Sequence, residues 1–248
     1  MNSLYANARN ETERLWRRRK TKGFALVAAL LPLLSVWALN ALPEGALQSA
    51  LGSDLTMLML RPLTLVLIPL FLMMTAADLF AGEAADGTLK LTLLRPITRA
   101  KVYASKIYAL SLFAAALLAI GWTVSTTAGV FVVGAEAADG LAESLKAYAV
   151  SLLPMVAIGL LASIVGLLVR SVAGAMATML LVYLAAGLLP FLFPQASVWS
   201  VVAYAQWHVR WSGSGAPVGS LVRAAGILLA YCIMAYTAGV VLLERKQL

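Results

Sequence analysis

Six long apolar segments dominate the sequence and restrict what it can fold into. They lie at residues 23–42, 55–80, 103–133, 147–169, 172–193 and 221–243. A helix of about 20 apolar residues crosses the roughly 30 Å hydrocarbon core of a bilayer, so each segment is long enough for one transmembrane helix. Six spans take up most of the 248 residues and leave no room for a large soluble domain. We therefore expect a single all-α polytopic membrane domain, residues 1–248.

Composition and charge agree with this expectation. Hydrophobic residues make up 62% of the chain and charged residues only 12%, and the mean hydropathy of +0.88 lies outside the range of soluble domains. The single cysteine, Cys232, cannot form an internal disulfide. The first 22 residues carry seven Lys or Arg and lack the apolar core of a cleavable signal. The first span is therefore expected to act as its own insertion signal.

The distribution of positive charge predicts the orientation. With both termini in the cytoplasm, 15 of the 19 Lys and Arg residues lie on the cytoplasmic side, and Lys146, Arg210 and Arg223 lie on the other. We attribute the net charge of +8 to this asymmetry rather than to nucleic-acid binding. The expected location is the bacterial inner membrane. The third segment is longer than one bilayer requires, so it should tilt or project from the membrane.

Residues 3–20 have the pattern of an amphipathic helix lying in the membrane surface. One face carries residues at helical spacing, namely Leu4, Tyr5, Ala8, Thr12, Leu15 and Trp16. Arginines occupy the rest of the surface, and Leu15 and Trp16 favour contact with membrane lipid. The alternative is a disordered basic tail that only follows the positive-inside rule.

The loop between the second and third spans contains a short helix-compatible piece with exposed leucines. Leu89, Leu93 and Leu94 precede Pro96, which stops the helix, and Thr98 is placed to cap the third span. An apolar face that lies neither in lipid nor in the chain's own core predicts a cytoplasmic partner.

The residues of this loop also form a family-like signature. They are Glu83, Gly87, Thr88, Leu89, Leu93, Leu94, Pro96, Ile97, Arg99 and Lys106. The pattern resembles the region between the second and third helices of ABC-2 type transporter permeases. The resemblance implies a coupling helix within residues 82–99 that docks in a groove of a separate cytoplasmic ATPase subunit.

By this resemblance, eight residues carry the contact with the ATPase: Glu83, Gly87, Thr88, Leu89, Leu93, Leu94, Pro96 and Arg99. For Glu83 and Arg99 the alternative is a solvated charge at the membrane edge. The resemblance further implies that the permease pairs with a second copy or with a related chain.

Nothing in the sequence predicts catalysis within this chain. Residues 82–88 have the glycine spacing of a phosphate loop but lack its lysine and a preceding strand. One histidine and one cysteine cannot form a zinc cluster, and we assign the pairs Met57/Met59 and Met73/Met74 to core packing rather than to copper. We expect no enzyme activity, cofactor or metal in the chain, with ATP and Mg bound by the partner subunit.

Ionisable residues inside spans are costly and are therefore functional candidates. We identify Arg61 and Asp78 as such residues. Arg61 can extend outward from its helix, and Asp78 lies within reach of cytoplasmic water. The absence of a central acidic or lysine relay weighs against an ion-coupled carrier.

The stretch from Pro194 to Pro217 is too polar to span but is rich in aromatic residues. Tyr204, Trp207 and Trp211 fall on one helical face, and Ser197 could cap its start. These residues form either an interfacial aromatic belt or, as the family resemblance implies, short extracellular re-entrant helices. We expect His208 to lie at the surface.

Small residues recur at four-residue spacing in the fourth and fifth spans, as Gly159/Ser163, Ala162/Gly166 and Ala173/Ala177. Such spacing allows helices to approach closely, either within this chain or at a subunit interface.

Together these features predict the permease subunit of an ATP-driven exporter that moves a hydrophobic or amphipathic substrate, such as a drug, a peptide antibiotic or a lipid-like molecule. The alternatives are an ion-coupled secondary transporter and a non-transporting membrane scaffold.

Overall fold

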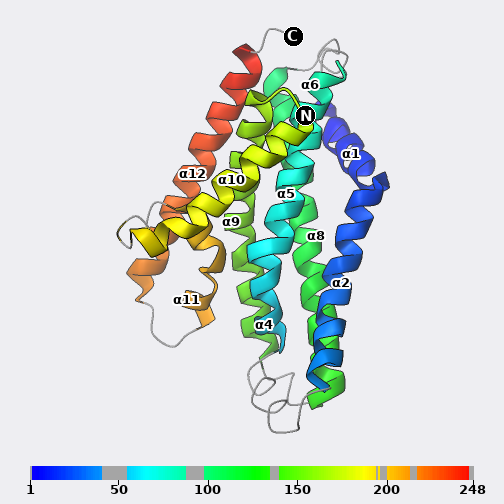
Figure 1. Ribbon diagram of the computed structural model, residues 1–248, viewed down its shortest axis with the longest axis vertical. Coiled ribbons are helices and arrows are strands. Elements are labelled where there is room, and N and C mark those ends of the chain that lie inside the picture. Colours follow the sequence, from blue (N-terminus) through cyan, green and yellow to red (C-terminus); the bar gives the residue numbers. More distant parts are fainter. Residues whose placement is uncertain are drawn as a thin grey trace.

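The computed structural model is almost entirely helical and contains no strand among the residues that it describes (Figure 1). These are residues 2–40, 55–87, 98–134, 140–193, 195, 200–212 and 217–245. Six helical stretches among them are long and apolar enough to cross a membrane. They are Arg19–Ala38, Leu55–Ala85, Arg99–Val132, Leu141–Leu168, Val172–Pro190 and Val218–Arg245. The predicted all-α polytopic fold with six transmembrane helices is thus confirmed.

The amphipathic helix and the first span follow each other almost without interruption. A single residue, Arg18, separates helix α1 (Asn2–Arg17) from α2 (Arg19–Asn40), and the chain bends there. The predicted helix over residues 3–20 therefore corresponds to α1 and the first residues of α2.

The second span is a continuous helical rod whose hydrogen bonding alternates between α and π. Its consecutive parts are α4 (Leu55–Pro62), η1 (Leu63–Leu67), α5 (Ile68–Ala76), η2 (Ala77–Gly82) and α6 (Glu83–Ala85). Pro69 contributes to this irregularity because it has no backbone N–H to continue the α-helical ladder.

The remaining spans are α8 (Arg99–Val133), α9 (Leu141–Leu168), α10 (Val172–Leu192) and α12 (Val218–Arg245). Two short helices, the 3₁₀ helix η5 (Val201–Gln206) and α11 (Val209–Ser212), lie between α10 and α12. Helix α8 has 35 residues and is therefore about 52 Å long at about 1.5 Å per residue. This length exceeds a hydrocarbon core of about 30 Å, as the sequence predicted.

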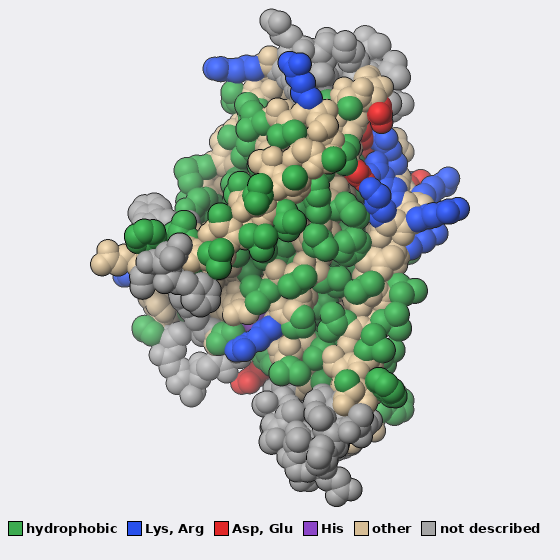
Figure 2. Space-filling view, viewed as in Figure 1, with side chains coloured by type: hydrophobic (Ala, Val, Ile, Leu, Met, Phe, Trp, Pro, Cys, Tyr) green, Lys and Arg blue, Asp and Glu red, His purple; other side chains and the backbone are tan. Residues whose placement is uncertain are grey.

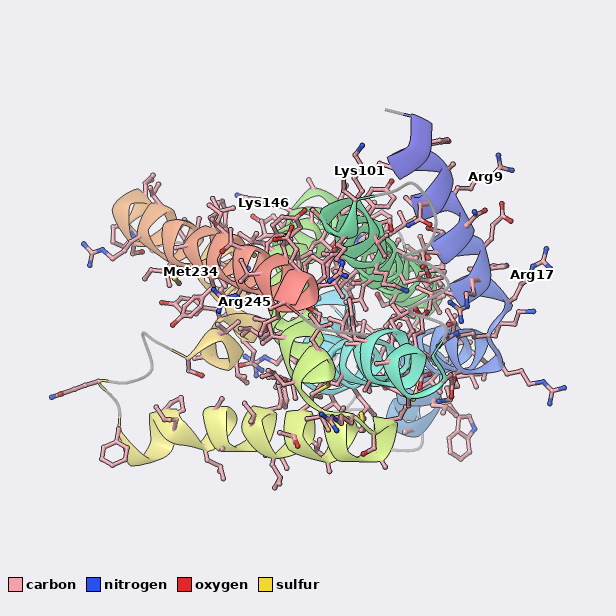
Figure 3. The ribbon with its side chains drawn as sticks, turned by 90° about the horizontal axis from the view of Figure 1, so that it is seen from above. Arg9, Arg17, Lys101, Lys146, Met234 and Arg245 are labelled. Carbon is pink, nitrogen blue, oxygen red and sulfur yellow. The ribbon has the colours of Figure 1, made fainter. Side chains whose placement is uncertain are left out.

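The spans differ greatly in how much of their surface the rest of the chain covers. The second span and α9 are mostly buried, whereas α2, α10 and α12 lie at the periphery. Seen along the bundle, α10 runs along one side of the molecule and α1 lies at another edge (Figure 3). Helix α1, the end of the second span and the end of α12 lie at the same end of the bundle (Figure 1), which we call the terminal end.

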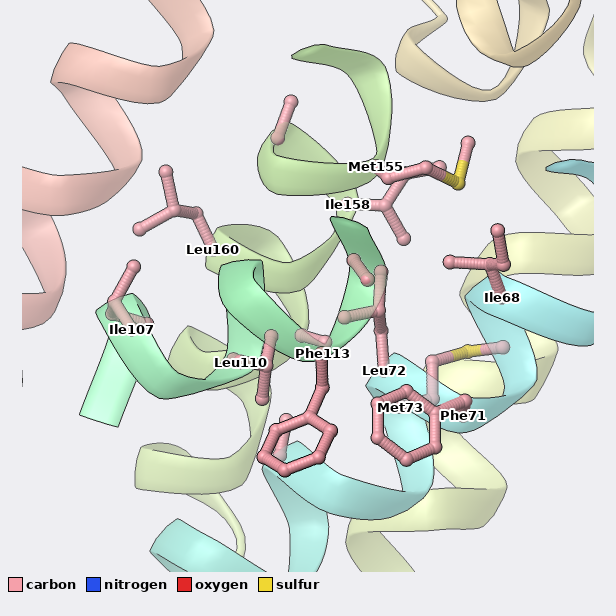
Figure 4. Packing of buried hydrophobic residues seen from close by; sticks show 14 of the residues in the cluster. Ile68, Phe71, Leu72, Met73, Ile107, Leu110, Phe113, Met155, Ile158 and Leu160 are labelled. Carbon is pink, nitrogen blue, oxygen red and sulfur yellow. The ribbon is translucent and has the colours of Figure 1, made fainter. Parts of the chain in front are cut away.

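Two glycines allow α9 to pack closely at the centre. A Cβ atom on Gly159 would meet Leu110 of α8, and one on Gly166 would lie 3.0 Å from the carbonyl oxygen of Ala76. Around them, apolar side chains of α5, α8 and α9 interdigitate (Figure 4). These small residues therefore serve packing within the chain, whereas Ala173 and Ala177 of α10 are exposed.

Candidate functional site

Four charged side chains meet at the terminal end, where α1, α6 and α8 come together. Lys106 of α8 is fully buried, and its Nζ lies 3.0 Å from Oε1 of Glu11 and 2.7 Å from Oε2 of Glu83. The other oxygen of Glu83, Oε1, accepts a hydrogen bond from Nη1 of Arg14 at 2.6 Å. Glu11, Arg14, Glu83 and Lys106, here called the ionic cluster, balance two positive charges against two negative ones. Such pairing is what allows charges to be buried.

Helical spacing explains how α1 supplies its part of the ionic cluster. Glu11 and Arg14 are three residues apart, so they lie on the same face of the helix. One turn earlier, Asn7 donates a hydrogen bond of 2.6 Å to the hydroxyl of Ser105, the neighbour of Lys106. Helix α1 is thus fixed to α8 by polar contacts along two turns.

The predicted apolar face of α1 is only partly correct. Ala8 and Leu15 are buried, but Tyr5 is 73% exposed and Trp16 57% exposed. The face against the bundle instead includes the polar Asn7 and Glu11. The apolar residues that point away from the bundle are available for contact with lipid.

A second set of ion pairs joins the second span to the start of α2. Oδ2 of Asp78 lies 3.1 Å from Nη1 of Arg18 and 3.1 Å from Nζ of Lys20. Asp78, predicted to lie within reach of cytoplasmic water, keeps 17% of its side chain exposed, and its carboxylate pairs with the junction of α1 and α2. Arg61, the other predicted intramembrane charge, is exposed on α4.

The structure places the two charged ends of the predicted coupling segment in contacts within the chain. Glu83 belongs to the ionic cluster. At the other end, Nη1 of Arg99 donates to the carbonyl oxygens of Leu243 and Glu244 at 3.2 and 2.7 Å, which places the guanidinium at the C-terminal end of α12, where cations are favoured. Neither residue is a solvated charge at a membrane edge.

Between these ends, the structure describes only part of the segment. Gly87 has a φ of +68°, a left-handed conformation that glycine adopts without strain. Thr98 occupies the N-cap position of α8 as predicted, although its side chain makes no capping hydrogen bond. Thr88, Leu89, Leu93, Leu94 and Pro96 lie outside the described residues.

A cavity of about 330 Å³ lies between the second span, α9, α10, η5 and α12. Its walls are almost entirely apolar and include Met73, Ile158, Val165, Met179, Val182 and Val201. Two of the hydroxyl groups in its lining, those of Tyr183 and Ser200, already donate hydrogen bonds to backbone carbonyls. The cavity therefore offers hydrocarbon surface to an occupant, as is typical of sites for hydrophobic ligands.

Both of these hydroxyl groups bind carbonyls that a proline has deprived of their α-helical donor. Tyr183 donates to the oxygen of Leu65, four residues before Pro69, at 2.7 Å. Ser200 donates to the oxygen of Ala186, four residues before Pro190, at 2.9 Å. Because proline has no N–H, a side chain from elsewhere must satisfy such a carbonyl in an apolar environment.

The same arrangement holds the aromatic segment before the last span. Trp207 donates from Nε1 to the oxygen of Val150, four residues before Pro154, at 3.0 Å. Its ring packs edge-on against Trp211 at 5.7 Å, and Tyr204 is buried beside it. Tyr204 and Trp207 are thus buried against the bundle, and short helices occur in this segment as the second alternative predicted. Trp199 and Ser197 lie outside the described residues.

His208 is buried, with 2% of its surface exposed, so the expectation that it lies at the surface is wrong. Burial lowers the pKa of its imidazole to about 4, and the nearby positive charge of Arg61 adds to this effect, while a backbone hydrogen bond with Ala205 opposes it. The fold of the aromatic segment therefore holds His208 in its neutral form at pH 7.

This burial predicts a pH-dependent stability. Between pH 6.5 and about 4, the unfolded chain binds a proton at His208 that the folded chain does not, so the free energy of unfolding should fall as the pH falls through this window. Thermal unfolding of the detergent-solubilised protein at several pH values measures the effect. His208→Gln, which removes the titrating group, should show a weaker pH dependence. Equal slopes for the two proteins would contradict the prediction.

Sequence reasoning missed the centre of the ionic cluster. Lys106 lies inside the predicted third span, yet only Arg61 and Asp78 were identified as intramembrane charges. Two features of the sequence indicate this cluster. Lys106 is a charged residue within an apolar span, and Asn7, Glu11 and Arg14 recur about one helical turn apart on a basic helix. Among the described residues, no group of His, Cys, Asp or Glu has the arrangement of a metal site.

Comparison with known proteins identifies a family, and the description of this family assigns no activity. Residues 39–246 match the family described as "Protein of unknown function (DUF2705)". A comparison with curated proteins finds no match.

Proposed function

Because the chain belongs to the DUF2705 family, whose description assigns no function, we propose a function from its own residues: it is the permease subunit of an ATP-driven, ABC-2 type exporter. Two such subunits pair in the bacterial inner membrane, with all termini in the cytoplasm. A separate ATPase subunit binds ATP and Mg and docks on the segment at residues 83–99. Hydrolysis there drives a hydrophobic or amphipathic substrate outward.

The observation that carries this proposal is the attachment of both ends of that segment to the bundle. Glu83 ties its start to α1 and α8 through Arg14 and Lys106. Arg99 ties its end to the last turn of α12. A force applied to the segment by a moving partner would therefore reach the second span, α1, α8 and α12 together. Such linkage is what a coupling element requires.

This geometry divides the predicted contact residues into two groups. Glu83 and Arg99 act as positioning residues, because their charged groups are engaged within the chain. Leu89, Leu93 and Leu94 are then the residues that enter the partner's groove. Gly87, with its left-handed backbone, lies between Glu83 and Leu89 in the sequence.

The apolar cavity supports the proposed class of substrate. Its walls offer almost no polar group, so an ion or a sugar would lose its hydration without compensation. A hydrocarbon chain or an aromatic drug would lose little. The proposed path for such a molecule runs along the second span, α9 and α10, which line the cavity.

The proposal predicts a stoichiometric ATPase partner. The tagged protein is purified from its native membrane in mild detergent, and mass spectrometry identifies what copurifies. We expect a soluble subunit with a phosphate-loop motif. Leu89→Asp should abolish this copurification, because a charge would be buried in an apolar groove, while the protein still inserts in the membrane.

A matched control is Leu51→Asp, the same substitution in the loop between the first two spans, which should retain the ATPase. Full retention by Leu89→Asp would contradict the coupling role of this segment. Transport in vesicles that depends on an ion gradient and not on ATP would instead identify a secondary carrier. A partner whose ATPase rate does not respond to any substrate would identify a scaffold.

A further inference from the structure

The junction of α1 and α2 sorts its positive charges into two sets. Arg18 and Lys20 turn toward the bundle and pair with Asp78. Arg17, Arg19 and Lys22 are exposed and form no ion pair within the described part of the chain. The space-filling view shows Lys and Arg side chains gathered on the right of its upper half, where Figure 1 places α1 and the start of α2 (Figure 2). From above, Arg17 points away from the bundle (Figure 3).

The exposed face of α2 changes from charged to apolar along its length. Lys22 is followed at four-residue intervals by Leu26, which is 58% exposed, and Leu30, which is 41% exposed. Residues four apart lie on one face and about 6 Å apart along the axis. Because Arg19 begins the first span, the cations lie where the hydrocarbon region begins and the leucines lie within it.

A shallow hollow adjoins the exposed cations on α1. It is lined by Thr12, Glu13, Trp16 and Arg17. One face of the indole of Trp16 is turned toward Phe113 of α8, with the ring centroids 6.1 Å apart, yet the side chain remains largely exposed. Glu13 is paired with Arg9 at 3.0 Å, so the charge that Arg17 presents to the hollow is not cancelled by it.

We propose that the junction of α1 and α2 binds an anionic glycerophospholipid. Its phosphate lies among Arg17, Arg19 and Lys22, and its acyl chains run beside Trp16 and down the leucine face of α2. On this surface the cations are followed by an apolar face, just as the phosphate of a phospholipid is followed by its acyl chains. An acidic protein segment would match the cations but not the apolar face that continues from them. The lipid therefore binds where α1 is fixed to the bundle, whatever substrate the protein moves.

The site can be tested by native mass spectrometry of the whole purified protein in detergent, titrated with phosphatidylglycerol or with phosphatidylcholine. We expect tighter retention of phosphatidylglycerol. Each Lys or Arg near an anionic membrane surface contributes about 1 kcal/mol, or about fivefold in affinity. The triple variant Arg17→Gln/Arg19→Gln/Lys22→Gln should therefore bind phosphatidylglycerol on the order of 100-fold more weakly.

A control with the same loss of charge is Lys101→Gln/Arg223→Gln/Arg245→Gln, which removes three exposed cations elsewhere and should bind as the wild type does. Equal weakening in the two triple variants would show a net-charge effect and overturn the proposal, as would unchanged binding in the first. If the first variant does not purify, Arg19→Gln alone should weaken binding about fivefold, and unchanged binding by it would also overturn the proposal.

A further titration separates a lipid from a free anion. Inorganic phosphate at the same concentration should not displace phosphatidylglycerol, because it lacks the acyl chains that contact Trp16 and Leu26. Displacement by phosphate would show a general anion site and overturn the assignment to a lipid.

Discussion

Replacement of Lys106 by methionine is expected to destabilise the protein by about 3–5 kcal/mol, the cost of breaking a buried ion pair from one side. Methionine fills a similar volume but leaves the buried carboxylate of Glu11 without its cationic partner, while Glu83 keeps Arg14. One oxygen of Glu11, Oε2, already has no hydrogen-bond partner among the described residues. Thermal unfolding in detergent and the rate of proteolysis of α1 measure the loss.

A matched control is Lys101→Met, which removes an exposed lysine from the same helix and should change stability by less than about 0.5 kcal/mol. The double variant Glu11→Leu/Lys106→Met removes both members of one pair and should be more stable than Lys106→Met alone. A double variant that is less stable than either single variant would show that the pair is not the source of the effect.

Gly239→Ala is expected to destabilise the protein by about 1–3 kcal/mol, the usual cost of overpacking a core. A Cβ atom at this position of α12 would overlap the hydroxyl and ring of Tyr103. Tyr103 cannot move away easily, because it is fully buried, shares a hydrogen bond of 2.7 Å with Ser163 and packs against Phe80 and Tyr236. The thermal unfolding midpoint is the measurement.

The same helix provides the control for this prediction. A Cβ atom on Gly226 would have no neighbour within 4 Å, so Gly226→Ala should leave stability unchanged or raise it by up to about 1 kcal/mol through better helix propensity. If the two alanine variants unfold alike, the close approach of α12 to Tyr103 does not contribute to stability. Gly239→Ala/Tyr103→Phe should recover little, because most of the ring remains in place.

The sequence was sufficient to predict the six spans because an apolar run of this length has few other stable structures in a cell. It could not predict which spans lie at the centre. Lipid and protein interior are both apolar, so the exposed face of α10 and the buried faces of α9 have similar composition. Close-packing glycines do not settle the question either, because they occur both in the central α9, at Gly159 and Gly166, and in the peripheral α12, at Gly239.

The candidate site was predictable to a lesser extent. The leucines and the proline of the loop after the second span predict a docking segment, but the contacts that hold its ends depend on residues far apart in sequence. Glu83 is paired with Arg14, 69 residues earlier, and Arg99 binds a carbonyl 145 residues later. Periodicity within one segment carries no information about such partners. The predicted stripe on α1 is only partly correct for the same reason, since its partner surface on α8 is itself polar at Ser105 and Lys106.

The three prolines described above each leave one backbone carbonyl free to accept a hydrogen bond from another element. A carbonyl four residues before a proline has no α-helical N–H to return to, so its bond to Tyr183, Ser200 or Trp207 replaces nothing within its own helix. Removal of one of these donors would leave a buried carbonyl without a hydrogen bond, which costs about 1–3 kcal/mol. At these three points, the second span is therefore held to α10, α10 to the segment before η5, and α9 to the segment after η5, by a side-chain hydrogen bond that makes up for a missing backbone one.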